Sequence, residues 1–131
     1  VLTEGDDPQD PIADAARGIL DGHIVMSRRI AESGIYPAID IESSISRVAN
    51  DCTSLEHQQK VRQLRGLLAA YNRNRDLIAI GAYQRGADPR TDAALALWPR
   101  IEAFLKQDVQ AGAGFGESLS ALYNLLESAP A

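Results

Sequence analysis

The stretch Gly34-Ile-Tyr-Pro-Ala-Ile-Asp-Ile-Glu-Ser-Ser-Ile-Ser-Arg-Val-Ala-Asn50 divides the chain into two parts of different character. It contains Tyr36, an aromatic residue placed directly before Pro37, and Arg47, a cation that follows a run of small polar residues. The residues before this stretch are typical of the end of an α/β domain, whereas those after it have the periodicity of packed helices. We therefore work outward from these residues in both directions.

Downstream, the apolar residues recur at helical spacing from Ser54 onward. One long helix is predicted from about Leu55 to Ile80, and Gly81 closes it. A second helix starts at Asp88-Pro89, because Asp is a favoured N-cap and Pro is favoured at the first helical position.

Pro99 lies inside this second helix, so we expect the helix to kink or split there. A glycine-rich loop at residues 112–116 precedes a last predicted helix. The apolar residues of that helix follow the spacing i, i+3, i+4 and i+7, and they are Leu119, Leu122, Tyr123 and Leu126. Residues 53–131 therefore predict an antiparallel helical bundle.

Upstream, short elements of both kinds alternate. Residues Val1–Thr3 are typical of the end of a buried strand. Asp10-Pro11 is typical of the start of a helix, and that helix has an apolar face. Residues 23–26 predict a strand, after which Ser27 caps a brief helix that ends at Gly34. The order strand, helix, strand, helix is that of an α/β core.

The composition narrows the class of protein. A chain of 131 residues suits one domain, or a small domain with part of another. The net charge of −5 argues against nucleic-acid binding, although a few arginines and backbone N–H groups are enough to hold a phosphate.

No apolar run approaches the roughly 20 residues that span a bilayer, so the chain is not expected to be transmembrane. The N-terminal residues do not resemble a signal peptide, and the lack of an initiator Met suggests a fragment of a longer protein. The lone Cys52 favours a reducing compartment.

The sequence contains no complete active site. There is no Gly-x-x-x-x-Gly-Lys-Ser/Thr phosphate loop, and the glycine-rich run from Gly112 has no lysine. His23 and His57 lack partners at ligand spacing, so no metal site is expected. The acidic residues near the N-terminus, Glu4, Asp6, Asp7 and Asp10, favour a solvated turn with capping duties over a cation site.

Tyr36 and Arg47 remain as candidates, and each has two interpretations. Tyr36 is either a packing aromatic or a flat ring on which a base stacks. Arg47 either pairs with Asp40, Glu42 or Asp51, or meets a phosphate, because a guanidinium grips anionic oxygens in a fixed fork. The physical chemistry of either residue alone leaves both interpretations open.

Several longer motifs resemble one family closely. They are Glu4-Gly-Asp-Asp-Pro, the run from Asp10 to Ala31 that contains Gly-His-Ile-Val-Met-Ser-Arg-Arg, and Gly34 to Val48. The family is that of the ATPases of flagellar and type III protein export, which are similar to the catalytic subunit of rotary ATP synthases. The run Asn74-Arg-Asp-Leu-Ile-Ala-Ile-Gly-Ala-Tyr-Gln-Arg-Gly-Ala-Asp-Pro and the run Ala96-Leu-Trp-Pro-Arg-Ile-Glu-Ala-Phe-Leu resemble the flagellar branch in particular.

The resemblance implies a mainly α fold, in which a C-terminal antiparallel helical bundle follows the last α/β elements of a RecA-like phosphate-loop ATPase domain. Residues 1–50 would be the end of that central domain, and residues 51–131 the C-terminal helical domain. It also implies a homohexamer that hydrolyses ATP with Mg²⁺ to drive or gate the export of flagellar proteins. The phosphate loop would lie upstream, so this chain alone is expected to be inactive, with no cofactor bound.

The family's site residues carry over by position. Tyr36, with Pro37 beside it, matches the aromatic residue that lines the adenine pocket of its own subunit. Arg47 matches the arginine finger that reaches into the neighbouring subunit's site. An arginine delivered in trans is worth about 10³–10⁵ in the rate of phosphoryl transfer.

The resemblance also implies partners and a location. The loop from Gly81 to Asp88 corresponds to the region that contacts a central stalk, which in the export family is a coiled-coil protein. Export-gate components, export substrates and chaperones are the other expected partners, at the cytoplasmic side of the export apparatus on the inner face of the membrane. Two alternatives remain: a fragment of an injectisome type III secretion ATPase, and a stand-alone helical interaction module.

Overall fold

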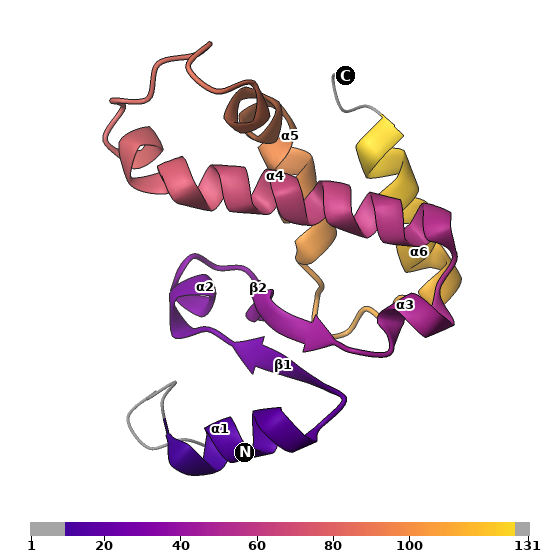
Figure 1. Ribbon diagram of the computed structural model, residues 1–131. Coiled ribbons are helices and arrows are strands. Elements are labelled where there is room, and N and C mark those ends of the chain that lie inside the picture. Colours follow the sequence, from indigo (N-terminus) through magenta and orange to yellow (C-terminus); the bar gives the residue numbers. More distant parts are fainter. Residues whose placement is uncertain (1–9, 128–131) are drawn as a thin grey trace.

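The computed structural model describes residues 10–127, so the predicted strand at Val1–Thr3 and most of the acidic turn lie outside the described residues. The elements, in chain order, are α1 (Pro11–Ile19), β1 (Gly22–Met26), α2 (Arg28–Glu32), β2 (Ile39–Ser46), α3 (Ala49–Cys52), α4 (Leu55–Ala79), α5 (Pro89–Leu105) and α6 (Phe115–Glu127). Figure 1 shows α1 and the two strands on one side of the long helix α4.

The predicted long helix is confirmed as α4, which has 25 residues. The Ser54 side chain accepts a hydrogen bond from the backbone N–H of His57 at 3.2 Å, which satisfies one of the unpaired donors at the start of the helix. Gly81 follows the end of α4 with φ +70°, a left-handed conformation that glycine adopts without steric cost.

The helix α5 begins as predicted, with Asp88 as N-cap and Pro89 in the first turn. It runs without interruption through Pro99 to Leu105, so a split at Pro99 is wrong. The side chain of Pro99 is exposed, whereas Leu97 and Ile101 on either side of it are buried. The packing of that buried face stabilises the helix in spite of the backbone hydrogen bond that Pro99 cannot donate.

The core joins the three long helices, which confirms the predicted bundle. Its apolar side chains are Leu64, Leu67 and Leu68 from α4, Ala94, Leu97 and Ile101 from α5, and Leu122, Leu125 and Leu126 from α6. Thr91 is the one polar residue of the described chain that is fully buried. Its hydroxyl donates a hydrogen bond to Asp88 Oδ2 and accepts one from Asn74 Nδ2. The buried hydroxyl therefore has hydrogen-bond partners inside the protein.

The two strands form an antiparallel sheet in which Met26 pairs with Ile39 and Gly22 with Ser46. The register is irregular between His23 and Val25, where β2 contributes the additional residues 41–44. The sequence analysis did not predict β2. Isoleucines at positions 39, 41 and 45 are the alternating pattern that indicates it.

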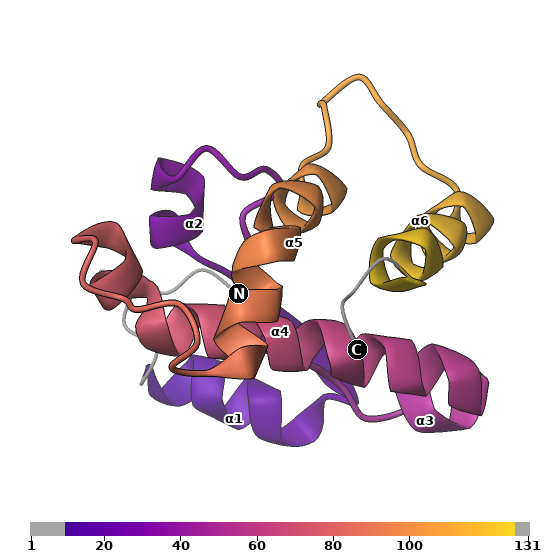
Figure 2. The same cartoon turned by 90° about the horizontal axis from the view of Figure 1, so that it is seen from above.

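This irregularity turns β2 toward the helical bundle. The Arg65 guanidinium on α4 donates to the backbone carbonyls of Glu42 and Ser44 at 3.1 and 3.2 Å. The Asn72 amide donates to the Glu42 carboxylate, and the Ile41 side chain packs against the helical core. The bulge therefore attaches the α/β part to α4. Figure 1 shows β2 between β1 and α4, and Figure 2 shows α5 running across α4.

The predicted helix at Asp10-Pro11 is confirmed as α1, and Asp10 Oδ1 accepts the N–H groups of Ile12 and Ala13. Its apolar face, however, is exposed to solvent: Ile12 and Ile19 are 73% and 82% exposed. Ile24 and Met26 of β1 are exposed as well. Exposed large apolar side chains on neighbouring elements are typical of a surface that another part of a protein covers.

The predicted strand at residues 23–26 and the brief helix after it are confirmed as β1 and α2. Ser27 stands at the N-cap of α2, but its side chain makes no capping hydrogen bond. Its backbone N–H instead donates to the carbonyl of Ala38 at 2.9 Å, which ties the start of α2 to the start of β2.

Candidate functional site

Tyr36 lies in the turn that leads from α2 into β2. Its side chain is 55% exposed, so the ring is not part of the core. Its carbonyl accepts a hydrogen bond from the backbone N–H of Gln107, in the loop after α5, at 2.8 Å. The peptide bond to Pro37 is cis. The structure thus presents an aromatic ring to solvent on a backbone that the loop after α5 holds in place, an arrangement that suits a stacking surface.

Pro37 follows directly and is also exposed. Ala38, the next residue, is buried, and its carbonyl accepts from Ser27. Two exposed residues, Tyr36 and Pro37, are therefore followed at once by a buried residue, Ala38, whose backbone is hydrogen-bonded. The two predicted adenine-pocket residues lie together.

Arg47 comes directly after the last residue of β2, and its side chain is exposed. Its backbone N–H donates to the carbonyl of Asp21 at 2.8 Å, and its guanidinium Nη2 donates to the carbonyl of Arg17 at 3.4 Å. Within the described residues it makes no ion pair with the carboxylates that the sequence offered as partners, Asp40, Glu42 and Asp51. The guanidinium keeps most of its donors available for an anion.

The structure does not bring Tyr36 and Arg47 together. The eight residues of β2 lie between them in the chain. Tyr36 lies beside the loop after α5, and Arg47 lies beside the end of α1. The two residues therefore face different surroundings and do not form one site within this chain.

The two histidines have ordinary surroundings. His23 Nε2 lies 3.1 Å from the carbonyl oxygen of Ser43 across the sheet, and His57 lies near Phe115, with ring centroids 6.2 Å apart. Among residues 10–127, no three side chains of His, Cys, Asp and Glu gather as a metal site would require. No helix in the described part of the chain is long and apolar enough to cross a bilayer.

The loop between α4 and α5 is ordered by its own hydrogen bonds. The Tyr83 hydroxyl lies 3.1 Å from the Asp88 carbonyl and 3.0 Å from Asp92 Oδ1, and the N–H of Gly86 donates to Asp92 Oδ2 at 2.7 Å. Partial removal of the Tyr83 hydroxyl from water, and its bond to Asp92, raise the pKa of Tyr83 above its ordinary value. Exposed Ile80 stands at the base of this loop.

Sequence reasoning missed the residues that hold the site in place. Gln107 holds Tyr36, and Arg65 and Asn72 hold β2. All three act across long separations in sequence, and three of their four hydrogen bonds end on backbone carbonyls. No local sequence pattern predicts such contacts. The alternating isoleucines indicate only that β2 is a strand.

Comparison with known proteins gives two family matches along the chain. Residues 53–124 match the T3SS EscN ATPase C-terminal domain, and residues 1–46 match the ATP synthase alpha/beta family, nucleotide-binding domain.

Among curated proteins, the chain is 57% identical over 122 residues to the flagellum-specific ATP synthase of Salmonella typhimurium, covering 93% of this chain and 27% of that protein. It is 48% identical over 130 residues to the type 3 secretion system ATPase of Pseudomonas syringae pv. syringae, covering 99% of this chain and 29% of that protein. The chain therefore spans less than a third of the length of these relatives.

Among solved structures, the chain superposes on the assembled ATPase EscN from the type III secretion system of enteropathogenic E. coli with a TM-score of 0.90. The sequence identity is 37%, and the match covers 96% of this chain and 31% of that one. EscN in complex with its central stalk EscO also matches, with a TM-score of 0.82, 36% identity, and coverage of 89% of this chain and 29% of that one.

Proposed function

Because this chain belongs to the family of T3SS EscN ATPase C-terminal domains, we propose that it is the C-terminal part of a flagellar export ATPase. The whole protein would hydrolyse ATP in a homohexameric ring and so drive or gate the export of flagellar proteins. The observation that carries the proposal is the 57% identity to a flagellum-specific ATP synthase over 93% of this chain.

The proposed domain division is residues 1–50 for the end of the RecA-like central domain and residues 51–131 for the C-terminal helical domain. Two observations support it. The nucleotide-binding match ends at residue 46 and the helical-domain match begins at residue 53. The apolar side chains that α1 and β1 leave exposed, among them Ile12, Ile19 and Ile24, are those that the rest of a central domain would cover.

Arg47 is proposed as the arginine finger that acts on the neighbouring subunit's nucleotide. The exposure of its side chain supports this role, because a residue that acts on a neighbouring subunit has to project from the surface of its own subunit. Its guanidinium stays charged at every physiological pH and meets phosphoryl oxygens in a planar fork. Phosphoryl transfer spreads negative charge over those oxygens, so a cation delivered there stabilises the transition state.

Tyr36 and Pro37 are proposed to line the adenine pocket of their own subunit. The exposed Tyr36 ring and its backbone anchor to Gln107 fit a base-stacking role. The 131 residues contain no phosphate loop with its lysine, so this chain offers only the base side of an ATP and Mg²⁺ site. We therefore expect this chain alone to hydrolyse no ATP, with no cofactor bound.

The C-terminal domain is proposed to contact a coiled-coil stalk protein through the loop between α4 and α5. The EscN structure with its central stalk supports the class of partner, and the hydrogen bonds of Tyr83 and Gly86 to Asp92 give the loop a defined shape. Export-gate components and export substrates or chaperones are the other proposed partners. The location proposed for the assembly is the cytoplasmic, inner face of the membrane at the flagellar export apparatus.

An injectisome type III secretion ATPase is the second candidate, since a relative of that name is 48% identical. The higher identity of 57% to the flagellar relative favours flagellar export. The match of residues 1–46 to a nucleotide-binding domain disfavours a stand-alone helical module.

The test replaces Arg47 by Lys in the longer protein that carries this chain. A Lys keeps the charge and loses the planar fork. We expect near-normal nucleotide binding, while ATP turnover falls by about 10³-fold or more, which is the scale for an arginine finger supplied in trans. Steady-state hydrolysis and equilibrium binding of a fluorescent nucleotide measure the two quantities separately.

The matched control is Arg62→Lys, since Arg62 is an exposed arginine on α4 and is not one of the candidate site residues. It should leave both turnover and binding unchanged. Normal turnover in Arg47→Lys would remove Arg47 from the catalytic machinery. Mixing that variant with a subunit that cannot bind nucleotide should partly restore turnover if the finger acts between subunits.

A further inference from the structure

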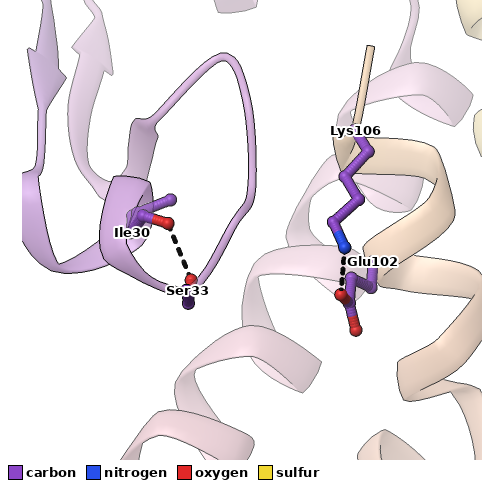
Figure 3. A network of polar contacts seen from close by, with 4 residues as sticks. All are labelled: Ile30, Ser33, Glu102 and Lys106. Carbon is purple, nitrogen blue, oxygen red and sulfur yellow. Dashed lines mark hydrogen bonds and ion pairs between the residues drawn. The ribbon is translucent and has the colours of Figure 1, made fainter. Parts of the chain in front are cut away.

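A cavity of about 320 Å³ lies at the junction between the α/β part and the helical bundle. One wall comes from α2, from the turn after it and from the start of β2, and it includes Ile30, Ser33 and Pro37. The opposite wall comes from α4 and α5. Figure 3 shows Ile30 of α2 with Ser33, which follows α2, and, apart from them, Glu102 of α5 with its partner Lys106. Its volume lies at the lower end of the range for cavities that take small molecules, about 300–1,000 Å³.

The floor of the cavity is apolar and aromatic. Tyr71 on α4 and Trp98 on α5 stack with ring centroids 3.5 Å apart and planes inclined by 7°. Leu68 and Leu105 line the cavity beside them. Each of these residues also belongs to, or packs against, the helical core, so the floor is preformed. Such a surface favours a ligand with an apolar body the size of one or two rings.

The carboxylates of the cavity lining already have partners. The Glu102 carboxylate accepts from Lys106 Nζ at 2.5 Å, and the Glu42 carboxylate accepts from the Asn72 amide. Asp40 Oδ1 accepts the backbone N–H groups of residues 42 and 43 at 3.0 and 3.1 Å. Each of these carboxylates therefore accepts a hydrogen bond from the protein, and Glu102 is paired with a cation.

The two arginines of the lining differ from the carboxylates. The guanidinium groups of Arg29 on α2 and Arg75 on α4 make no hydrogen bond, ion pair or ring contact with any side chain of residues 10–127. A guanidinium binds carboxylate, sulfonate or phosphate oxygens in a bidentate fork. The cavity thus combines an apolar floor with two cations that have no partner among residues 10–127.

We propose that this cavity is a binding site for a small amphipathic anion, a molecule with a ring-sized apolar body and one carboxylate, sulfonate or phosphate group. The apolar body lies on Tyr71 and Trp98, and the anionic group meets Arg29 and Arg75. Because the walls come from both parts of the chain, the ligand contacts both and fixes their relative position. This proposal does not depend on the function proposed above.

The probe for this test is 8-anilinonaphthalene-1-sulfonate, which has a ring-sized apolar body and one anionic group. Trp98 is the only tryptophan of the chain, so quenching of its fluorescence by the probe reports occupancy from within the cavity lining. We expect saturable binding of one probe molecule per chain. The melting temperature of the chain should rise with probe concentration, because the ligand binds the folded state.

The variants Arg29→Gln and Arg75→Gln should each weaken binding of the sulfonate by about tenfold, the scale of one hydrogen bond to a charged group. Arg62→Gln, an exposed arginine on α4 outside the cavity, is the matched control and should bind like the unaltered chain. The neutral analogue 1-anilinonaphthalene should bind more weakly and should show no difference between these variants. Far-UV circular dichroism of each variant establishes that the probe is binding to folded chains.

Three results would overturn the proposal. They are sulfonate affinities of Arg29→Gln and Arg75→Gln equal to that of Arg62→Gln, binding that does not saturate at one molecule per chain, and equal affinity for the neutral analogue. Where a variant loses its helical circular dichroism, the Lys substitution at the same position replaces it. Arg29→Lys and Arg75→Lys keep the charge and should bind the sulfonate more tightly than the neutral analogue.

Discussion

The backbone of Tyr36 is fixed by a hydrogen bond from Gln107, while more than half of its side chain is exposed to water. A packing aromatic would have the opposite character, because burial of its ring is what stabilises the fold. Arg47 has a similar combination, with an anchored N–H and an exposed guanidinium. At the scale of single residues, both side chains are therefore exposed on a backbone that is held in place.

Replacing Tyr36 by Ala in the longer protein should weaken ATP binding by about 1–3 kcal/mol, the scale for loss of one base–aromatic stack. Equilibrium titration with a fluorescent ATP analogue measures this difference. Tyr36→Phe is the control, since it keeps the ring and should retain the affinity. Unaltered affinity in Tyr36→Ala would instead assign the residue to local packing, and its melting temperature would then fall.

At the scale of elements, the N-terminus of α5 carries a cap with several partners. Asp88 Oδ1 accepts the backbone N–H of Arg90 at 3.1 Å, and Oδ2 accepts the hydroxyl of the buried Thr91 at 2.6 Å. The hydrogen bond from Thr91 is the main cause that holds the pKa of Asp88 below its ordinary value of 3.8. The ionised form of Asp88 is therefore the one that the folded state favours.

This direction sets the pH dependence of the cap. Since the pKa of Asp88 is lower in the folded than in the unfolded chain, its contribution is fully present above pH 3.8 and is lost as pH falls through the folded-state pKa. We expect the melting temperature of the unaltered chain to exceed that of Asp88→Ala at neutral pH by several degrees. The difference should shrink progressively below pH 3.8. Thermal melts followed by circular dichroism measure it.

Asp88→Asn is the control for the charge, because Asn also caps helices and does not titrate. Its stability relative to Asp88→Ala should not follow the same decline in acid. A difference between the unaltered chain and Asp88→Ala that stays constant from neutral to acidic pH would show that ionisation of Asp88 plays no part in the cap.

At the scale of the whole molecule, one core shared by α4, α5 and α6 holds the bundle together. Ile101 on α5 is fully buried in it, whereas Ile80 at the end of α4 is 75% exposed. These two isoleucines allow the effect of an alanine substitution in the core to be compared with its effect at the surface. Both parts of the chain depend on this core, because β2 is attached to the bundle through Ile41, Arg65 and Asn72.

Ile101→Ala should lower the free energy of unfolding by about 2–5 kcal/mol, from lost apolar burial and the cavity left behind. Ile80→Ala should change it by no more than about 0.5 kcal/mol, as expected of an exposed position. Urea denaturation followed by circular dichroism measures both. If Ile101→Ala is already unfolded without urea, Ile101→Val provides the measurable step of about 0.5–1.5 kcal/mol. Equal effects of the two alanine substitutions would contradict the core as described.

Much of this fold was predictable because its strongest determinants are local. Asp88 with Pro89 starts a helix by capping chemistry and fixed φ, and Gly81 ends one by adopting positive φ. The alternative of a split at Pro99 was wrong for the same reason: the local effect of proline is to break a helix, whereas the buried neighbours Leu97 and Ile101 keep α5 continuous. The candidate residues Tyr36, Pro37 and Arg47 came from motif resemblance, and their roles remain predictions.

By itself, the sequence determined the helical bundle, its caps and its family, since periodicity, capping residues and long motifs can each be read without knowing what lies nearby in space. The tertiary structure alone decided that β2 bulges toward Arg65 and Asn72, that Gln107 holds Tyr36, and that Arg29 and Arg75 face one cavity. These features depend on contacts between residues far apart in the chain and on backbone carbonyls that every residue type carries. Local sequence does not specify such contacts; the packing of the core brings them together.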